Sequence, residues 1–150
     1  MSEPMDSMPI EILLVEDSAT DALLTTEALK EASIPTQLHL VVDGVEAMAF
    51  LRREGRFKDA PRPHLTLLDW NLPRKSGREV LREMKDDDGL KEIPVIVFST
   101  SRAGADIDDS YRLHANSYVT KPVGFDAYTD AMRAIGEFWF RTAALPQTVD

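Results

Sequence analysis

The stretch HLTLLDWNLPRKSG, residues 64–77, decides the fold. Its apolar run, residues 65–68, has the length of a buried strand and ends at a single carboxylate, Asp69. Residues that favour turns come next, and a helical pattern resumes directly after Asn71, Pro73, Ser76 and Gly77. A buried strand that carries one acid at its carboxyl end is how open α/β sheets place chemical groups. Taken alone, Asp69 could equally be a turn former or a helix cap.

Four further apolar runs of strand length alternate with helical patterns along the chain. The runs cover residues 10–15, 36–42, 95–98 and 117–120. The helical patterns run from Ser18 to before Pro35, over 45–51, around Val80 to Met84, over 104–115 and over 125–142. The first of them begins at Ser18, with Asp21 three residues on in a capping-box arrangement. In this helix Leu24, Ala28 and Ala32 share one face, with Leu23 beside them. Strands separated by helices indicate right-handed crossovers and a parallel sheet. We therefore expect an α/β fold of five parallel strands in the order 2-1-3-4-5 with five helices, doubly wound and flavodoxin-like.

The composition narrows the classes of function. A chain of 150 residues has room for one domain with a hydrophobic core. It contains no cysteine, and its three histidines, His39, His64 and His114, lack the spacing of a metal site. The net charge of −9 argues against direct nucleic-acid binding and suits cations and basic partner surfaces.

The two ends of the chain carry no targeting pattern. The first nine residues have neither the basic nor the apolar region of a signal peptide, and no apolar run approaches the roughly 18 residues of a membrane span. We expect a cytoplasmic protein without a membrane segment. Residues 1–9 and 143–150 are predicted to be flexible, on either side of one domain at 10–142.

Polar side chains follow four of the predicted strands. Glu16 and Asp17 follow the first strand, Asp69 the third, Ser99 the fourth and Lys121 the fifth. Because the carboxyl ends of parallel strands meet at one edge, and strands one and three are neighbours, three carboxylates would crowd together there. Their mutual repulsion favours a divalent cation such as Mg²⁺, and Lys121 adds a fixed positive charge.

This set of groups fits phosphoryl chemistry. A carboxylate such as Asp69 can accept a phosphoryl group and form an aspartyl phosphate. Mg²⁺ and a positioned cation stabilise the phosphoryl oxygens during such a transfer. The hydroxyl of Ser99 could then donate a hydrogen bond to a phosphoryl oxygen. We expect a site that binds and switches rather than one that turns over substrate.

The ordered motifs resemble the receiver domain of two-component response regulators over about residues 10–140. They are the pair Glu16-Asp17, the DWNLP stretch with Asp69, the hydroxyls Ser99-Thr100 and the pair Lys121-Pro122. The resemblance implies a single-domain response regulator of a phosphorelay, not an enzyme, that a histidine kinase phosphorylates.

The resemblance also assigns roles to residues of the acidic cluster. It implies that Asp69 is the phosphoacceptor and that Lys121 pairs with the phosphoryl group. Glu16 and Asp17 would organise Mg²⁺, with Asp17 and Asp69 as the nearer ligands. The backbone carbonyl of Asn71 would complete the protein's share of the coordination.

Further roles fall on the fourth and fifth strands. Ser99 and Tyr118 would form the switch pair, and Asn71 and Ser101 would tune the lifetime of the phosphoryl group. Neither of these two is an acid or a base, so water activation is expected to be weak. The chain departs from the family pattern at His114, where many receivers have glycine, and at Ser99, where threonine is commoner.

The segments NLPRKSGREVLREMK and HANSYVTKPV resemble, more narrowly, the regulators that partner bacterial phytochrome-type light-sensing kinases. The helix from Ser18 would then dock a histidine kinase or phosphotransfer domain. In the last helix Tyr128, Met132, Ile135 and Trp139 share one face, while Phe138 and Phe140 lie off it. These two aromatics either fold back on the domain or join a homodimer. The homodimer interface would be formed by the fourth helix, the fifth strand and the fifth helix, at 104–115, 117–120 and 125–142.

Two other classes of protein compete with this interpretation. An aspartate-nucleophile phosphatase of the haloacid dehalogenase type would need a second aspartate two residues after the nucleophile, where this chain has Asn71. A nucleotide- or flavin-binding domain would need a glycine- or hydroxyl-rich loop after the first strand. The chain instead has VEDSATD there, whose carboxylates repel phosphate.

Overall fold

Five parallel strands form the centre of the computed structural model, which describes residues 9–31 and 35–146. They are β1 (Ile10–Val15), β2 (Thr36–Val41), β3 (Leu65–Leu68), β4 (Val95–Ser99) and β5 (Ser117–Thr120). The order β2-β1-β3-β4-β5 confirms the predicted topology. The predicted flexible segments at 1–9 and 143–150 lie mostly outside the described residues.

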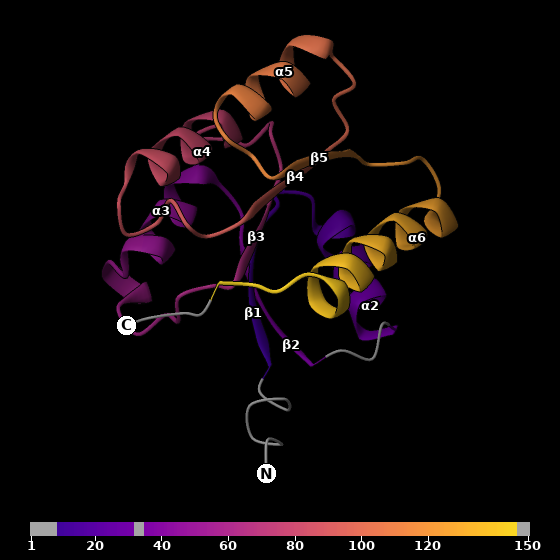
Figure 1. Cartoon of the computed structure of the whole chain (residues 1–150), viewed down its shortest axis with the longest axis horizontal. Coiled ribbons are helices and arrows are strands. Elements are labelled where there is room, and N and C mark those ends of the chain that lie inside the picture. Colours follow the sequence, from indigo (N-terminus) through magenta and orange to yellow (C-terminus); the bar gives the residue numbers. More distant parts are fainter. Residues whose placement is uncertain (1–8, 32–34, 147–150) are drawn as a thin grey trace.

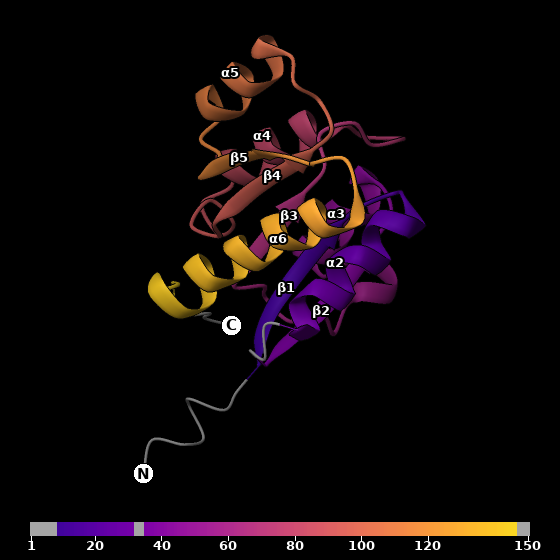
Figure 2. The ribbon, with the colours of Figure 1, turned by 90° about the vertical axis from the view of Figure 1, so that its right-hand side faces the viewer.

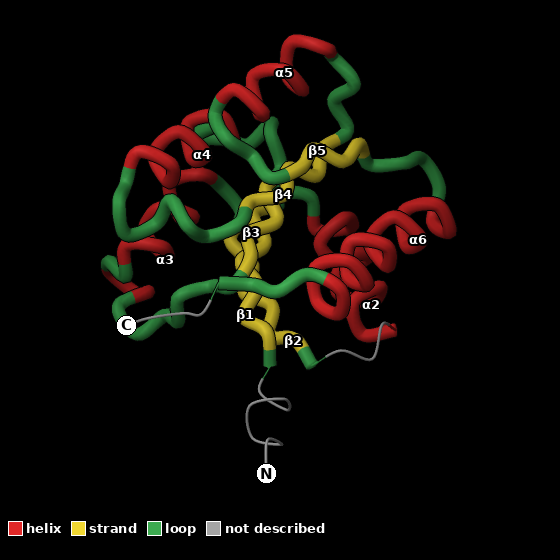
Figure 3. Tube along the Cα trace, in the orientation of Figure 1, coloured by secondary structure: helices red, strands yellow, loops and turns green. Residues whose placement is uncertain are grey.

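Helices cover both faces of the sheet. They are α2 (Ala19–Glu31), α3 (Gly44–Arg52), α4 (Gly77–Asp86), α5 (Gly104–Arg112) and α6 (Phe125–Gly136), and α6 continues as a π-helical segment, Glu137–Thr142. A short 3-10 turn, Gly55–Phe57, follows α3. Helices α2 and α6 lie side by side on one face, and α3, α4 and α5 lie on the other (Figures 1 and 2). The strands are thus enclosed between two helical layers (Figure 3).

The core consists of two apolar layers, one on each face of the sheet. Along β1, Ile12 and Leu14 pack toward α2 and α6, whereas Leu13 and Val15 pack toward α3 and α4. Strands buried on both faces explain why the sequence shows continuous apolar runs rather than alternation. Thr66 in β3 interrupts this apolar interior. Among the buried side-chain polar atoms of residues 9–31 and 35–146, only its Oγ1 lacks a hydrogen-bond partner.

The turn after β3 folds tightly against the strand ends. Gly77 donates its backbone N–H to the carbonyl of Trp70 at 2.9 Å. A Cβ atom at Gly77 would lie 2.2 Å from the carbonyl oxygen of Asp69, so only glycine fits this approach. Ser76 and Glu79 form a capping box that begins α4. The turn residues of the opening stretch therefore fix where Asp69 stands.

One predicted helix face and several predicted boundaries differ from the structure. Ser18 caps α2 as expected, but the buried face carries Ala22, Thr25, Ala28 and Leu29, and Leu23 is 61% exposed. Ala32, predicted on that face, lies outside the described residues. The fourth strand extends to Ser99, and the second ends at Val41.

The predicted helix at 104–115 ends earlier, at Arg112. His114 adopts φ 73°, the left-handed conformation in which helices commonly end. Glycine is the usual residue in that conformation, so the geometry accounts for the family's preference at the position where this chain has histidine.

The last helix buries Tyr128, Met132 and Ile135 as predicted. Trp139 is half-buried against the same core layer, and Phe140 packs there beside Gly136. Phe138 is 52% exposed, so one of the two aromatics that lie off the stripe is exposed, as expected. In the part of the chain that the structure covers, no helix combines the length and apolar character of a membrane span.

Candidate functional site

Three predicted site residues meet at the carboxyl edge of the sheet. The backbone N–H of Asp69 donates to the carbonyl of Val15 at 3.1 Å, which places the end of β3 beside Glu16. Lys121 enters from β5, and its Nζ lies 2.6 Å from Glu16 Oε1 and 3.1 Å from Asp69 Oδ2. Lys121 is 4% exposed, so these ion pairs are shielded from water. The predicted convergence of Glu16, Asp69 and Lys121 is therefore present.

Glu16, Asp17 and Asp69 form an oxygen cluster that could hold a divalent cation. One carboxylate oxygen from each residue lies within 4.8 Å of the other two. Hard divalent cations take such oxygen ligands and retain several waters. Glu16 is buried, Asp69 is 9% exposed and Asp17 is exposed, so one side of the cluster opens to solvent. The donor set therefore fits the predicted metal.

Burial and Lys121 shift the pKa of Glu16 in opposite directions. Burial raises the pKa of Glu16 to about 7, although its hydrogen bond with Lys121 works against that rise. Burial alone would lower the pKa of the Lys121 ammonium, but its hydrogen bonds with Glu16 and Asp21 raise it above the usual range. Lys121 therefore remains charged, and the neighbouring carboxylates share its single ammonium group.

Both oxygens of Asp69 are oriented. Its Oδ1 accepts the backbone N–H of Trp70 at 2.7 Å, and its Oδ2 accepts Lys121 Nζ. A side chain held at both oxygens presents its carboxylate in one orientation, which is what attack on an incoming group requires.

Asp21 is a further partner of Lys121 that the sequence did not predict. Its Oδ2 accepts Lys121 Nζ at 2.9 Å. The sequence pattern indicated only a capping role, and its backbone N–H does donate to Ser18 Oγ at 3.2 Å. The available signal was its place in the first turn of the helix that directly follows Glu16 and Asp17.

The predicted hydroxyl residues Ser99, Ser101 and Tyr118 form hydrogen bonds around the loop that follows β4. Ser99 is fully buried, and its Oγ accepts the backbone N–H of Ser101 at 3.4 Å. Tyr118 Oη donates to the backbone carbonyl of Ser101 at 2.8 Å, so it contacts the loop after Ser99. Ser101 Oγ donates to Asp106 Oδ2 at 2.5 Å. Asn71 is exposed on the turn after Asp69.

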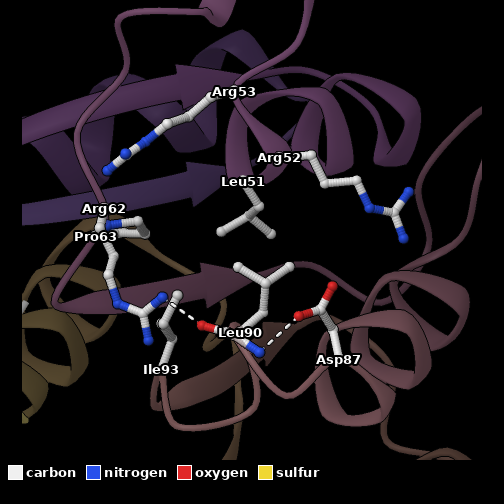
Figure 4. A pocket seen from close by; sticks show the side chains of 9 residues that line it. Leu51, Arg52, Arg53, Arg62, Pro63, Asp87, Leu90 and Ile93 are labelled. Carbon is white, nitrogen blue, oxygen red and sulfur yellow. Dashed lines mark hydrogen bonds between the residues drawn. The ribbon is translucent and has the colours of Figure 1, made fainter. Parts of the chain in front are cut away.

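A hollow of about 310 Å³ lies at the opposite edge of the sheet, where β3 and β4 begin. Apolar side chains line it with Arg52, Arg53 and Arg62, and Arg62 donates to the carbonyl of Gly89 (Figure 4). None of the predicted site residues belongs to it.

Comparison with known proteins settles the family. Residues 12–133 match the response regulator receiver domain. The chain belongs to this family. As a receiver, it is 46% identical over 138 residues to response regulator Rcp1 of Synechocystis sp., which covers 92% of this chain and 94% of Rcp1. The resemblance inferred from the motifs is confirmed.

Solved receiver structures share its fold. The phosphorylated cyanobacterial phytochrome response regulator RcpA superposes with a TM-score of 0.90 at 48% identity and covers 93% of this chain and 100% of its own. The Mn²⁺-bound form of Rcp1 gives 0.90 at 46% identity with the same coverage. The bacteriophytochrome response regulator RtBRR gives 0.73 at 37% identity and covers 93% of this receiver and 84% of its own chain.

Proposed function

We propose that this receiver accepts a phosphoryl group on Asp69 and changes its binding surface in response. The observation that carries the proposal is Lys121 Nζ, which bridges Glu16 and Asp69 in a site closed to water on the lysine side. In the transfer, an Asp69 oxygen forms the new O–P bond while the P–N bond of a phosphohistidine breaks. The released imidazole keeps the electron pair and takes up a proton.

The residues of this chain supply positioning and charge. Lys121 would neutralise one oxygen of the arriving phosphoryl group, and Glu16, Asp17 and Asp69 would hold Mg²⁺, with the Asn71 carbonyl as a further ligand. When bound, that cation supplies charge neutralisation for the phosphoryl oxygens. Ser99 and Tyr118 would report the change, and Asn71 and Ser101 would set its lifetime.

The natural donor in this proposal is a histidine kinase of the phytochrome type, acting in the cytoplasm on a receiver unit at 10–142. The support is the likeness to RcpA, Rcp1 and RtBRR, two of which are described as phytochrome or bacteriophytochrome regulators. A labelled phytochrome-type kinase should lose its phosphoryl group to this protein faster than an unrelated histidine kinase does. Equal transfer from both would remove the narrower assignment.

Intact-mass measurement after incubation with acetyl phosphate tests the acceptor. The wild type should gain one phosphoryl group only with Mg²⁺, and Asp69→Asn should gain none. Asp88→Asn is the matched control, because the Asp88 side chain is 96% exposed and the charge change is the same. Labelling that persists in Asp69→Asn would refute the proposal. Rapid, catalytic release of phosphate would instead support the haloacid dehalogenase type of hydrolase, which the family membership disfavours.

We also propose a homodimer through α5, β5 and α6. Exposed apolar side chains lie on α5, on the loop between β5 and α6, on α6 and on the π-helical segment that continues it: Tyr111 at 49%, Val123 at 92%, Phe125 at 58% and Phe138 at 52%. Sedimentation of the free and phosphorylated protein should give a dimer that Phe138→Ala weakens. A monomer at all concentrations in both states would exclude it.

A further inference from the structure

The ammonium group of Lys121 has three protons, and three carboxylates accept them. The acceptors are Glu16 at 2.6 Å, Asp21 at 2.9 Å and Asp69 at 3.1 Å. A lysine side chain is a flexible four-carbon stem, so its ammonium keeps one position only when hydrogen-bond partners hold it. Because the Lys121 side chain is 3% exposed, its place depends on these three acids.

Two of the three acceptors are also proposed ligands of the divalent cation. Glu16 and Asp69 belong to the oxygen cluster with Asp17, and Asp21 does not. A cation on that cluster competes with Lys121 for the negative charge of Glu16 and Asp69 and repels its ammonium. Asp21 is thus the acceptor that Lys121 retains when the other two turn to the metal.

We infer that Asp21 is a positioning residue, which holds Lys121 beside the phosphoacceptor while a divalent cation occupies the acidic cluster. This inference rests on the proposed function. It assigns Asp21 no contact with the phosphoryl group, because its effect passes through the Lys121 ammonium.

Asp21 is itself fixed from two sides. It lies in the first turn of α2, where Ser18 caps its backbone N–H. From the neighbouring helix, Tyr128 Oη donates to the backbone carbonyl of Asp21 at 3.2 Å and pairs with Thr25 Oγ1 at 3.0 Å. The Tyr128 ring packs edge-on against Phe98 at a centroid distance of 5.2 Å. Helix α6 therefore supports the residue that supports the lysine.

A purely electrostatic role for Asp21 predicts the opposite sign. With all four carboxylates ionised, the site with its lysine has a net charge of about −3, and a divalent cation brings it to about −1. If only charge mattered, removing the Asp21 charge would draw an anionic phosphodonor in and speed the reaction. If Asp21 positions Lys121, its removal slows the reaction, because a misplaced lysine no longer meets the transferring group.

The test compares Asp21→Asn and Asp21→Glu with the wild type and the control Asp88→Asn. Each protein is incubated with saturating Mg²⁺ and increasing acetyl phosphate, and labelling is followed by intact mass. We expect the maximal rate of Asp21→Asn to fall about tenfold, with the half-saturating donor concentration unchanged. In Asp21→Asn the amide oxygen can accept only a weaker, uncharged hydrogen bond, whereas Asp21→Glu should recover part of the rate because it restores a carboxylate on a side chain one methylene longer. An Asp21→Asn rate equal to or above that of Asp88→Asn would overturn the inference.

A second readout does not depend on phosphoryl transfer. NMR of the Lys121 side-chain nitrogen in the Mg²⁺-loaded protein measures how mobile the ammonium is. The ammonium should be rigid in the wild type and mobile in Asp21→Asn. Tyr128→Phe should produce a smaller change of the same kind. A wild type that gains no phosphoryl group would refute the acceptor proposal alone. A rigid Lys121 ammonium in Asp21→Asn would refute the positioning role alone.

Discussion

The two sides of Asp69 differ in how tightly they are packed. The lysine flank comprises Lys121 with α2 and α6, and the serine flank comprises Ser99 with the following loop and α5. On the lysine flank, α6 buries Tyr128, Thr129, Met132, Ile135 and Gly136, and side-chain hydrogen bonds join it to α2. On the serine flank, α5 buries only Ser110. Segments with few buried groups open at a lower free-energy cost than the core does. The lysine flank is thus suited to hold chemical groups in place, and the serine flank is suited to move.

Truncation of an apolar side chain on each flank should give the largest contrast. Met132 is fully buried, so Met132→Ala should lower the free energy of unfolding by about 2–5 kcal/mol through lost contacts and a cavity. Ile107 on α5 is only half-buried, so Ile107→Ala should cost less than about 1.5 kcal/mol. Urea unfolding measures both. Equal losses would contradict the difference between the flanks.

Added methyl groups compare the turn after Asp69 with the serine flank. A Cβ at Gly77 meets the Asp69 carbonyl, so Gly77→Ala should destabilise the fold by about 1–3 kcal/mol and reduce phosphorylation. A Cβ at Gly104, the first residue of α5, meets nothing within 4 Å, so Gly104→Ala should be neutral or slightly stabilising. Thermal unfolding of the Gly77→Ala and Gly104→Ala variants measures both changes in stability. A destabilised Gly104→Ala would mean that α5 is packed more tightly than its burial indicates.

The pH dependence of cation binding tests the charge balance on the lysine flank. Because the pKa of Glu16 is raised to about 7, it must lose a proton before it can join a metal. The apparent affinity for Mg²⁺ should therefore rise up to about tenfold per pH unit below pH 7 and level off above it. Titration calorimetry at several pH values measures this. Glu16→Gln should remove the dependence on this group, and a flat wild-type profile would contradict the prediction.

Without metal, the stability effect of Glu16 has the opposite sign. Its pKa is higher in the folded state than the ordinary 4.5, so the folded protein binds more protons between about pH 4.5 and 7. The contribution of Glu16 to stability is therefore present at low pH and is lost as the pH rises through 7. Urea unfolding in a chelator, compared between wild type and Glu16→Gln, isolates this contribution.

Loss of one hydrogen bond on the serine flank should have the smallest effect. Tyr118→Phe removes the donor to the Ser101 carbonyl and should cost about 1 kcal/mol or less, because Tyr118 is half-buried. Amide hydrogen exchange over residues 100–106 should nevertheless become faster. A loss as large as that of Met132→Ala would show that this flank carries core stability.

Much of the site could be predicted because it depends on where strands end. Apolar runs located the strands, and parallel strands end at one edge, so Glu16, Asp17, Asp69 and Lys121 had to meet. Asp21 escaped prediction because its contact depends on the rotation of α2 about its axis and on the reach of a lysine from β5. Periodicity in apolar residues does not determine either.

The face of α2 shows the same limit. The pattern favoured Leu24 and Leu23, yet the helix buries Thr25 and leaves Leu23 exposed. Thr25 is buried because its hydroxyl pairs with Tyr128, a partner more than a hundred positions away in the chain. A polar residue with a distant partner cannot be assigned to a core from local pattern alone.

The unpaired hydroxyl of Thr66, in the middle strand, has a consequence for the evolution and redesign of this protein. Valine has nearly the same shape and lacks the oxygen that finds no partner there. Thr66→Val should add about 1 kcal/mol of stability without touching the acidic edge. Such a reserve would let a lineage, or a designer, tolerate costly changes on the output surface that would otherwise unfold the domain.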